Sequence, residues 1–154
     1  MEWKMVGKKM TLRALLAATV LIPLYAAPSA ADQNSAGDII VEISGASSDK
    51  GKILWRMFDN ESDFEDPETG GILEGECDIQ DRKCTFTIPS LAFGRYAIMA
   101  GHDANSDQDI SKNPFSNEPK GITNYNEKIF WFPDFKKAIF KHDKSNTAIR
   151  LRLF

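Results

Sequence analysis

The sequence predicts an all-β fold, an antiparallel sandwich of about seven strands. Three observations support this prediction. Apolar and polar residues alternate with a period of two along several short stretches, as they do in strands with one buried face. Turn-forming residues, chiefly Gly, Asp, Asn, Ser and Pro, separate these stretches at close intervals. After residue 31 the sequence contains no long amphipathic helical pattern, no repeat and no low-complexity tract.

The first 31 residues have the composition of a secretory signal peptide. A basic stretch precedes an almost unbroken apolar run over residues 14–27, and four small residues follow it. The basic residues are Lys4, Lys8, Lys9 and Arg13, and the small ones are Pro28, Ser29, Ala30 and Ala31. Cleavage is expected after Ala31 or, as the alternative, after Ala30. A retained anchor is less favoured, because a membrane span needs about 20 residues.

Residues 32–154 suit one domain with one core. Residues 1–31 hold four of the 19 basic and one of the 22 acidic residues, so the rest of the chain carries a formal net charge of −6. Such a surface does not attract nucleic acid or anionic lipid. We therefore expect a bacterial periplasmic or secreted domain with no nucleic-acid partner and no stable membrane span after cleavage.

The first two predicted strands cover residues 39–43 and 53–58. Each places three apolar side chains on one face: Ile39, Val41 and Ile43 in the first strand, and Ile53, Trp55 and Met57 in the second. The segment between them, residues 47–51, combines Ser, Asp, Lys and Gly, which suit a tight reversal. The two strands are therefore expected to pair as a hairpin.

A carboxylate-rich loop over residues 59–71 is expected next, held down by Phe64. Strands are then expected over residues 72–78 and 84–88, the second ended by Pro89. Cys77 and Cys84 are the only two cysteines, and an even count in an oxidising compartment predicts a disulfide. This bridge would staple the hairpin. A metal or redox pair is the disfavoured alternative, because the spacing is not Cys-x-x-Cys and no further soft ligand lies nearby.

One face of the following strand consists of Tyr96, Ile98, Ala100 and His102. A long polar connection, residues 103–127, comes after it, and loops of this length are usually functional or disordered. An aromatic segment, residues 129–135, precedes two last strands at about 138–141 and 148–154. Trp131 and Phe132 are candidates for an exposed sugar- or peptide-stacking platform, with burial in the core as the alternative.

Six short motifs occur in an order that marks a resemblance to a known family. They are Ile-Val-Glu-Ile at 40–43, Gly-Lys-Ile-Leu-Trp-Arg-Met-Phe-Asp at 51–59, Leu91-x-x-Gly94-x-Tyr96-Ala97-Ile98, Gly101-His102-Asp103-x-Asn105-x-Asp107, Gly121-x-x-Asn124-x-Asn126 and Phe132-Pro133-x-Phe135-x-x-Ala138-x-Phe140. From about residue 38 to 154 the chain resembles the bacterial exported family catalogued as domain of unknown function 2141. The resemblance implies a transthyretin-like (prealbumin-like) or carboxypeptidase-regulatory-like β-sandwich and no established activity. The chain departs from the family in one loop, where Gln108 replaces a Gly, Ser111 replaces an Asp, and Asp109 is added.

Oxygen-bearing side chains recur at every second residue of that loop, namely at Asp103, Asn105, Asp107 and Asp109. Calcium takes six to eight oxygen ligands, and a turning loop with ligands at its positions 1, 3 and 5 can supply several of them. Calcium is therefore the one cofactor that the sequence suggests. The loop lacks the Gly and the bidentate Glu of an EF-hand, so another group must complete the shell. The candidates are Asn113, Asn117, Glu118 and the loop at 59–68. A solvated acidic loop that binds no metal is the alternative.

His102 and His142 are the only histidines, and each precedes an aspartate. Neither pair has the spacing of transition-metal ligands within one element. His102 ends an apolar strand face, so we expect it to hydrogen-bond the start of the acidic loop. The sequence contains no Gly-x-Ser-x-Gly, no His-Glu-x-x-His and no lone reactive cysteine, so no catalytic residue is predicted.

These observations predict a non-enzymatic binding or accessory module with a calcium-stabilised loop. The candidates for its binding surface are His102, Asn124, Trp131 and Phe132. An unidentified protein or a carbohydrate is the expected ligand. Two alternatives stay open: a metal- or carboxylate-dependent hydrolase that uses His102 and the loop carboxylates, and a purely structural protein of the cell envelope.

Overall fold

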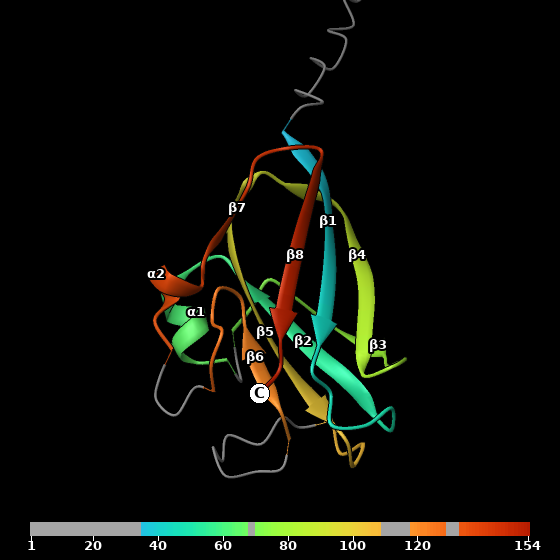
Figure 1. The fold of residues 1–154 in the computed structure, drawn as a ribbon. Helices are drawn as coiled ribbons and strands as arrows, with labels where there is room; N and C mark the ends of the chain where they lie inside the picture. The colour runs from blue at the N-terminus through green and yellow to red at the C-terminus, as the bar shows by residue number, and fades with distance from the viewer. Residues whose placement is uncertain (1–34, 68–69, 109–117, 129–132) are drawn as a thin grey trace, which may run out of the picture. The chain divides into compact units, whose positions relative to one another are not determined.

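A computed structural model describes residues 35–67, 70–108, 118–128 and 133–154. These residues belong to one compact unit, Asp32–Phe154. Eight strands in two sheets dominate it, with two short helices (Figure 1). The β-rich, two-sheet architecture expected from the sequence is therefore confirmed. Its finer assignment as a transthyretin-like sandwich stays a prediction.

The first sheet has three strands in the order β4-β1-β8. Their bounds are Lys83–Ala92 for β4, Ala36–Ser44 for β1 and Asn146–Arg152 for β8. β1 is antiparallel to β4 but parallel to β8. The sheet is therefore mixed, and the expectation of a wholly antiparallel sandwich was wrong in this respect. A parallel pair needs a long crossover, and here the whole second sheet lies between the two strands in sequence.

The second sheet has five strands, four of them in the order β3-β2-β5-β6. Their bounds are Leu73–Asp78 for β3, Lys52–Phe58 for β2, Gly94–Asp103 for β5 and Lys120–Ile122 for β6. The fifth strand, β7 (Phe140–His142), pairs with the first three residues of β5, and β6 pairs with residues 99–101 further along it. All the pairings in this sheet are antiparallel.

The expected hairpin of the first two strands is not formed. β1 and β2 lie in different sheets, so the segment after Ser44 carries the chain from one layer of the sandwich to the other. The alternation within each strand is confirmed, because Ile39, Val41 and Ile43 are all fully buried. These side chains and those of β2, β5 and β8 form the main core between the sheets. Ile40, on the opposite face of β1, is 41% exposed.

A second, smaller core covers the other face of β5. Its buried members are Phe58, Phe64, Ala97, Ile122, Tyr125 and Ala138. The two helices that contribute to it are α1 (Glu61–Glu65) and α2 (Phe135–Ala138), and Figure 1 shows them beside each other. Each helix begins at an amide or carboxylate cap, since Asn60 accepts from the Asp63 amide and Asp134 from the Lys136 amide. Phe64, expected to hold down its loop, is 1% exposed.

One buried and one exposed polar contact connect this second layer to the sheet. The Thr123 hydroxyl accepts from the Ile98 amide at 3.1 Å and donates to the Ala138 carbonyl at 2.7 Å. The Asn124 side chain donates to the Ile139 carbonyl at 2.8 Å, just past the end of α2. A helix of four residues cannot be stable by itself, so these bonds and the apolar contacts hold α2 in place.

The two sheets are joined at both sides. On one side, Lys120 and Phe154 exchange backbone hydrogen bonds of 3.4 and 3.0 Å, which link β6 to the segment after β8. On the other side, the chain passes from β3 to β4 through a two-residue turn in which Asp81 and Arg82 have φ of 52° and 57°. Positive φ at both central residues is typical of a type I′ hairpin turn.

The predicted disulfide at this turn is not formed, because the structure holds Cys77 and Cys84 as free thiols. The reason lies in the topology. Cys77 is opposite Ile53 in the five-stranded sheet, and Cys84 is opposite Ile43 in the three-stranded sheet. The two residues are therefore not neighbours in one ladder, as a hairpin staple would require.

Candidate functional site

The acidic loop begins at Asp103, the last residue of β5. Asp103 is only 3% exposed, and its carboxylate accepts three backbone N–H groups. One oxygen accepts from Ser106 at 2.7 Å and Asp107 at 3.2 Å, and the other accepts from Gln108 at 3.0 Å. These bonds hold residues 103–108 in a turn around the Asp103 carboxylate. Ser106 and Gln108 adopt positive φ of 62° and 64°, which gives the loop its tight curvature.

The other predicted ligands of the loop lie beside this turn. Asn105 donates its amide to the Asp107 carboxylate at 2.7 Å, and the Asp107 backbone N–H donates to the Asn105 side-chain oxygen at 3.1 Å. Asp109 lies outside the described residues. The alternation at 103, 105 and 107 therefore reflects a turn in which each polar side chain contacts a near neighbour, as short polar side chains do in Asx turns.

A third carboxylate joins the loop from elsewhere in the chain. Glu118 precedes β6, which pairs with β5, and the His102 amide donates to the Pro119 carbonyl at 2.9 Å. This pairing places Glu118 so that one carboxylate oxygen from each of Asp103, Asp107 and Glu118 lies within 4.8 Å of the other two. Among the described residues these three form the only such group. Glu118 was one of the groups expected to complete the shell, and Asn113 and Asn117, two others, lie outside the described residues.

The spacing of these oxygens suits a hard cation. Calcium–oxygen distances are about 2.3–2.6 Å, so two ligands on opposite sides of the ion lie about 4.6–5.2 Å apart. Three carboxylates this close repel one another, and a divalent cation would relieve that repulsion. Three carboxylate ligands fall short of the six to eight that calcium takes, so backbone oxygens, the Asn105 amide or water would supply the rest.

The segment between β1 and β2, residues 45–51, packs against the backbone of Asp103 at the start of the acidic loop. Gly51 has a φ of +73°, and a Cβ atom added to it would lie 1.9 Å from the Asp103 carbonyl oxygen. Only glycine fits there without a shift of the backbone. The same segment holds the tip of the β3–β4 hairpin, since the Asp49 carboxylate accepts from the Arg82 amide at 2.7 Å. Residues 45–51 therefore contact both Asp103, where the acidic loop begins, and the turn between β3 and β4.

His102 contacts the same segment and lies fully buried on the inner face of β5. Its Nδ1 accepts from the Ser47 amide at 3.1 Å and lies 2.9 Å from the Ser47 hydroxyl. Because Nδ1 accepts a backbone N–H, the ring proton is on Nε2, which donates to the Lys50 carbonyl at 2.7 Å. Both ring nitrogens are thus engaged with the segment at 45–51, and neither presents a lone pair to a metal.

The two histidines are far apart. His142 is opposite Gly94 at the start of β5, eight residues before His102, a separation of about 26 Å along an extended strand. His142 is fully buried and contacts the Thr147 hydroxyl at 2.6 Å and the Leu91 carbonyl at 3.2 Å. A surface hollow of about 570 Å³ lies at this end of β5, lined by Phe93, Gly94, Arg95, Lys141, His142 and Asp143. It is remote from the carboxylates.

Of the remaining residues proposed for a binding surface, Asn124 is the one that lies among the described residues. Asn124 spends its side-chain amide on the carbonyls at the end of α2. Trp131 and Phe132 lie outside the described residues. Trp55 is partly buried and packs against the main core, stacked on Phe86 with ring centroids 4.5 Å apart. Its Nε1 is buried and has no hydrogen-bond partner among the described residues.

None of the helices in the described part of the chain has the length and apolar character of a membrane-spanning helix. Searches of curated proteins and of solved structures gave no significant match. The family comparison gave a match over residues 41–150, which include most of both sheets, the acidic loop and Glu118. This match covers more than two thirds of the sequence, so the chain belongs to the bacterial family described as uncharacterized protein conserved in bacteria (DUF2141).

Proposed function

We propose that this protein is an exported, non-enzymatic accessory or binding module whose acidic loop binds calcium. The observation that carries the proposal is the convergence of Asp103, Asp107 and Glu118, with one oxygen of each within 4.8 Å of the others. The composition of residues 1–31 supports export. The β-rich, two-sheet fold supports a transthyretin-type sandwich.

The burial of Asp103 supports a cation site in which one ligand is rigid. Its carboxylate is fixed by three N–H groups, which leave one lone-pair site for an ion, on the oxygen that accepts only from Gln108. Asp107 is exposed and Glu118 is half-buried, so they can adjust to an ion from solvent. One fixed and two adjustable ligands suit modest affinity, with a Kd of about 10⁻⁴–10⁻³ M, as in extracellular calcium modules.

The bonds of His102 argue against the alternative of a histidine-dependent hydrolase. A general base must accept a proton from a reacting group within hydrogen-bond reach. Nδ1 of His102 already accepts from Ser47, and Nε2 donates to Lys50. The carboxylates therefore have no histidine partner available on the adjoining strand.

The test is a calorimetric titration of calcium into purified, chelator-stripped protein. The variant Asp107→Asn/Glu118→Gln removes two charges and keeps the side-chain volumes. Asp103 is left intact because its three N–H contacts shape the loop. The matched control is Glu74→Gln/Asp78→Asn, which removes two exposed charges from β3. We expect saturable heat for the wild type and the control, and at least a tenfold weaker Kd for the Asp107/Glu118 variant.

Two results would contradict the proposal. Absence of heat across the millimolar range would leave a structural sandwich protein of the envelope, the second alternative. Equal heat from the wild type and the Asp107/Glu118 variant would place the cation elsewhere. Export is tested separately: N-terminal sequencing of protein from the periplasmic fraction should begin at residue 31 or 32, and an intact residue 1 would refute it.

A further inference from the structure

The surface hollow of about 570 Å³ lies where β7 pairs with the start of β5. Its volume is within the range of small-molecule sites, about 300–1,000 Å³. Arg95 and Lys141 are directly opposite each other in this ladder, and both are exposed and line the hollow. Opposite residues of paired strands lie on the same face of a sheet. The hollow is therefore flanked by two neighbouring cations.

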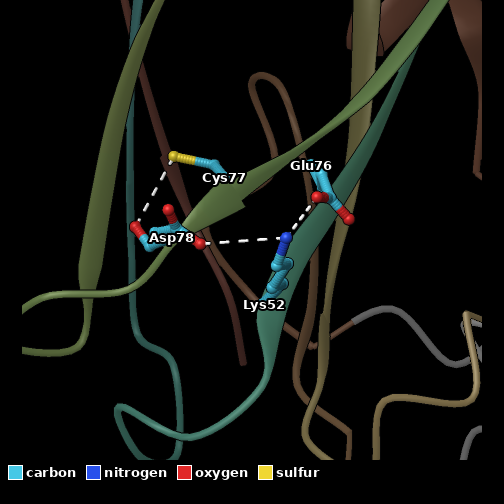
Figure 2. Close-up of polar contacts among 4 residues, drawn as sticks. All are labelled: Lys52, Glu76, Cys77 and Asp78. Atoms are coloured by element: carbon cyan, nitrogen blue, oxygen red, sulfur yellow. Dashed lines mark hydrogen bonds and ion pairs between the residues drawn. The ribbon is translucent and has the colours of Figure 1, made fainter.

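This pair of cations is unlike the charge pairing on the neighbouring ladder. Figure 2 shows Lys52 of β2 between the carboxylates of Glu76 and Asp78 on β3, so opposite charges face each other there. At Arg95 and Lys141 like charges are opposite, an arrangement that destabilises a sheet. An anion bound between the two side chains would relieve their repulsion.

A single carboxylate offsets part of this charge. The Asp143 carboxylate lies 2.7 Å from the Lys141 Nζ. Among the residues that the structure describes, no hydrogen bond or ion pair involves the Arg95 guanidinium. Two positive charges and one negative charge leave the group at a net charge of +1, which one carboxylate would balance. A guanidinium can bind a carboxylate through two parallel N–H···O bonds.

Other contacts hold the residues that line the hollow in place. His142 is fully buried, with Nδ1 2.6 Å from the Thr147 hydroxyl and Nε2 3.2 Å from the Leu91 carbonyl oxygen. The Phe93 amide donates to the Ser35 carbonyl at 2.8 Å, and the Phe93 ring lies edge-to-face with the His142 ring, with centroids 5.1 Å apart. Phe93 is still partly exposed, so it offers an apolar surface. A site whose walls are already ordered loses little entropy on binding.

We propose that this hollow binds a small organic carboxylate with an apolar body. The carboxylate pairs with Arg95 and Lys141, and the apolar body contacts Phe93. Such a ligand matches both features of the hollow, because small-molecule sites combine apolar surface with a few charged groups that fix the orientation of the ligand.

Benzoate is the probe for the test, since it joins one carboxylate to one apolar ring. It is titrated into the isotopically labelled protein, and the backbone amide shifts are followed by NMR. We expect saturable shifts at residues 93–95 and 141–143, with a Kd of about 1 mM for so small a ligand. Acetate lacks the ring and benzamide lacks the charge, so each should bind at least about fivefold more weakly.

Three variants test the role of the charges. Arg95→Gln removes the guanidinium and should weaken benzoate binding at least about fivefold. Asp143→Asn removes the competing carboxylate and should strengthen binding by about twofold or more. Changes of opposite sign separate electrostatic attraction from a loss of structure. The matched control is Arg150→Gln, which removes an exposed arginine from β8 and should bind benzoate as the wild type does.

Absence of saturable shifts at these residues across the millimolar range would overturn the proposal. So would equal affinity of the wild type for benzoate and for either acetate or benzamide, or unchanged benzoate affinity in Arg95→Gln. The acidic loop begins at Asp103, at the opposite end of β5 from Gly94, so the calcium titration and the benzoate titration succeed or fail independently.

Discussion

Replacing Thr123 with valine tests whether the second layer is fastened to the sheet by its buried hydroxyl. Valine has nearly the same shape but can neither accept from the Ile98 amide nor donate to the Ala138 carbonyl. Ile98 and Ala138 are both fully buried, so water cannot replace the lost partner. The backbone bond from the Thr123 amide to the Ile98 carbonyl is unaffected by the change.

The expected loss follows from one orphaned group and one weakened group. The buried Ile98 amide loses the Thr123 hydroxyl, which costs about 2 kcal/mol. The Ala138 carbonyl loses its 2.7 Å bond from Thr123, which costs about 1 kcal/mol, but keeps the 3.4 Å bond from the Asn124 side chain. The extra methyl group of valine regains about 1 kcal/mol of apolar burial. The net destabilisation is then about 2 kcal/mol, which corresponds to a fall in Tm of roughly 8 °C for a domain of this size.

Urea unfolding followed by tryptophan fluorescence measures the free energy of unfolding, and an unchanged m value would show that the comparison is valid. Thr123→Ser is the matched control, because it keeps the hydroxyl and loses only a methyl group, at a cost of about 1 kcal/mol. The reasoning is refuted if Thr123→Val is as stable as Thr123→Ser, since the hydroxyl would then contribute nothing.

Two further predictions concern other positions. Gly51→Ala should destabilise the protein by at least about 2 kcal/mol in the same assay, because the added Cβ meets the Asp103 carbonyl and φ is positive; unchanged stability would contradict the close approach. Tyr96 donates to the Ala92 carbonyl, and burial, with a smaller effect of Asp59, raises its pKa above the usual value of about 10. The stability it contributes is therefore fully present below about pH 10 and is lost as pH rises through the folded pKa. The stability difference between wild type and Tyr96→Phe should shrink above pH 10, and a constant difference would argue against the shift.

Local patterns in the sequence predicted the strands well, because each strand has one buried face. Ile39, Val41 and Ile43 alternate with more exposed neighbours as expected. The pairing of strands was predicted less well. A turn signal at residues 47–51 shows that the chain reverses, but it does not show whether the chain returns to the same sheet. Here it crosses to the other sheet, and the same limitation led to the prediction of a hairpin disulfide.

The residues of the candidate site were also predicted only in part. Asp103 and Asp107 were evident from their spacing, which reflects a local turn. The position of Glu118 beside them depends on the pairing of β6 with β5, which no local pattern encodes. His102 was expected to bond the acidic loop, whereas its partners, Ser47 and Lys50, come from the segment before β2. The tertiary structure determines the polar partners of a buried side chain, so a single sequence does not reveal them.

The parallel pairing of β1 with β8 also sets the order of events during synthesis. Ser44 donates to the Leu151 carbonyl, and these residues are 107 positions apart in sequence. At the usual rate of about 5–20 residues per second, β1 leaves the ribosome roughly 5–20 s before its parallel neighbour exists. The three-stranded sheet cannot be completed in that interval, and contacts of such long range also slow folding afterwards. Until β8 has been made, the nascent chain is therefore accessible to the factors that bind unfolded polypeptides.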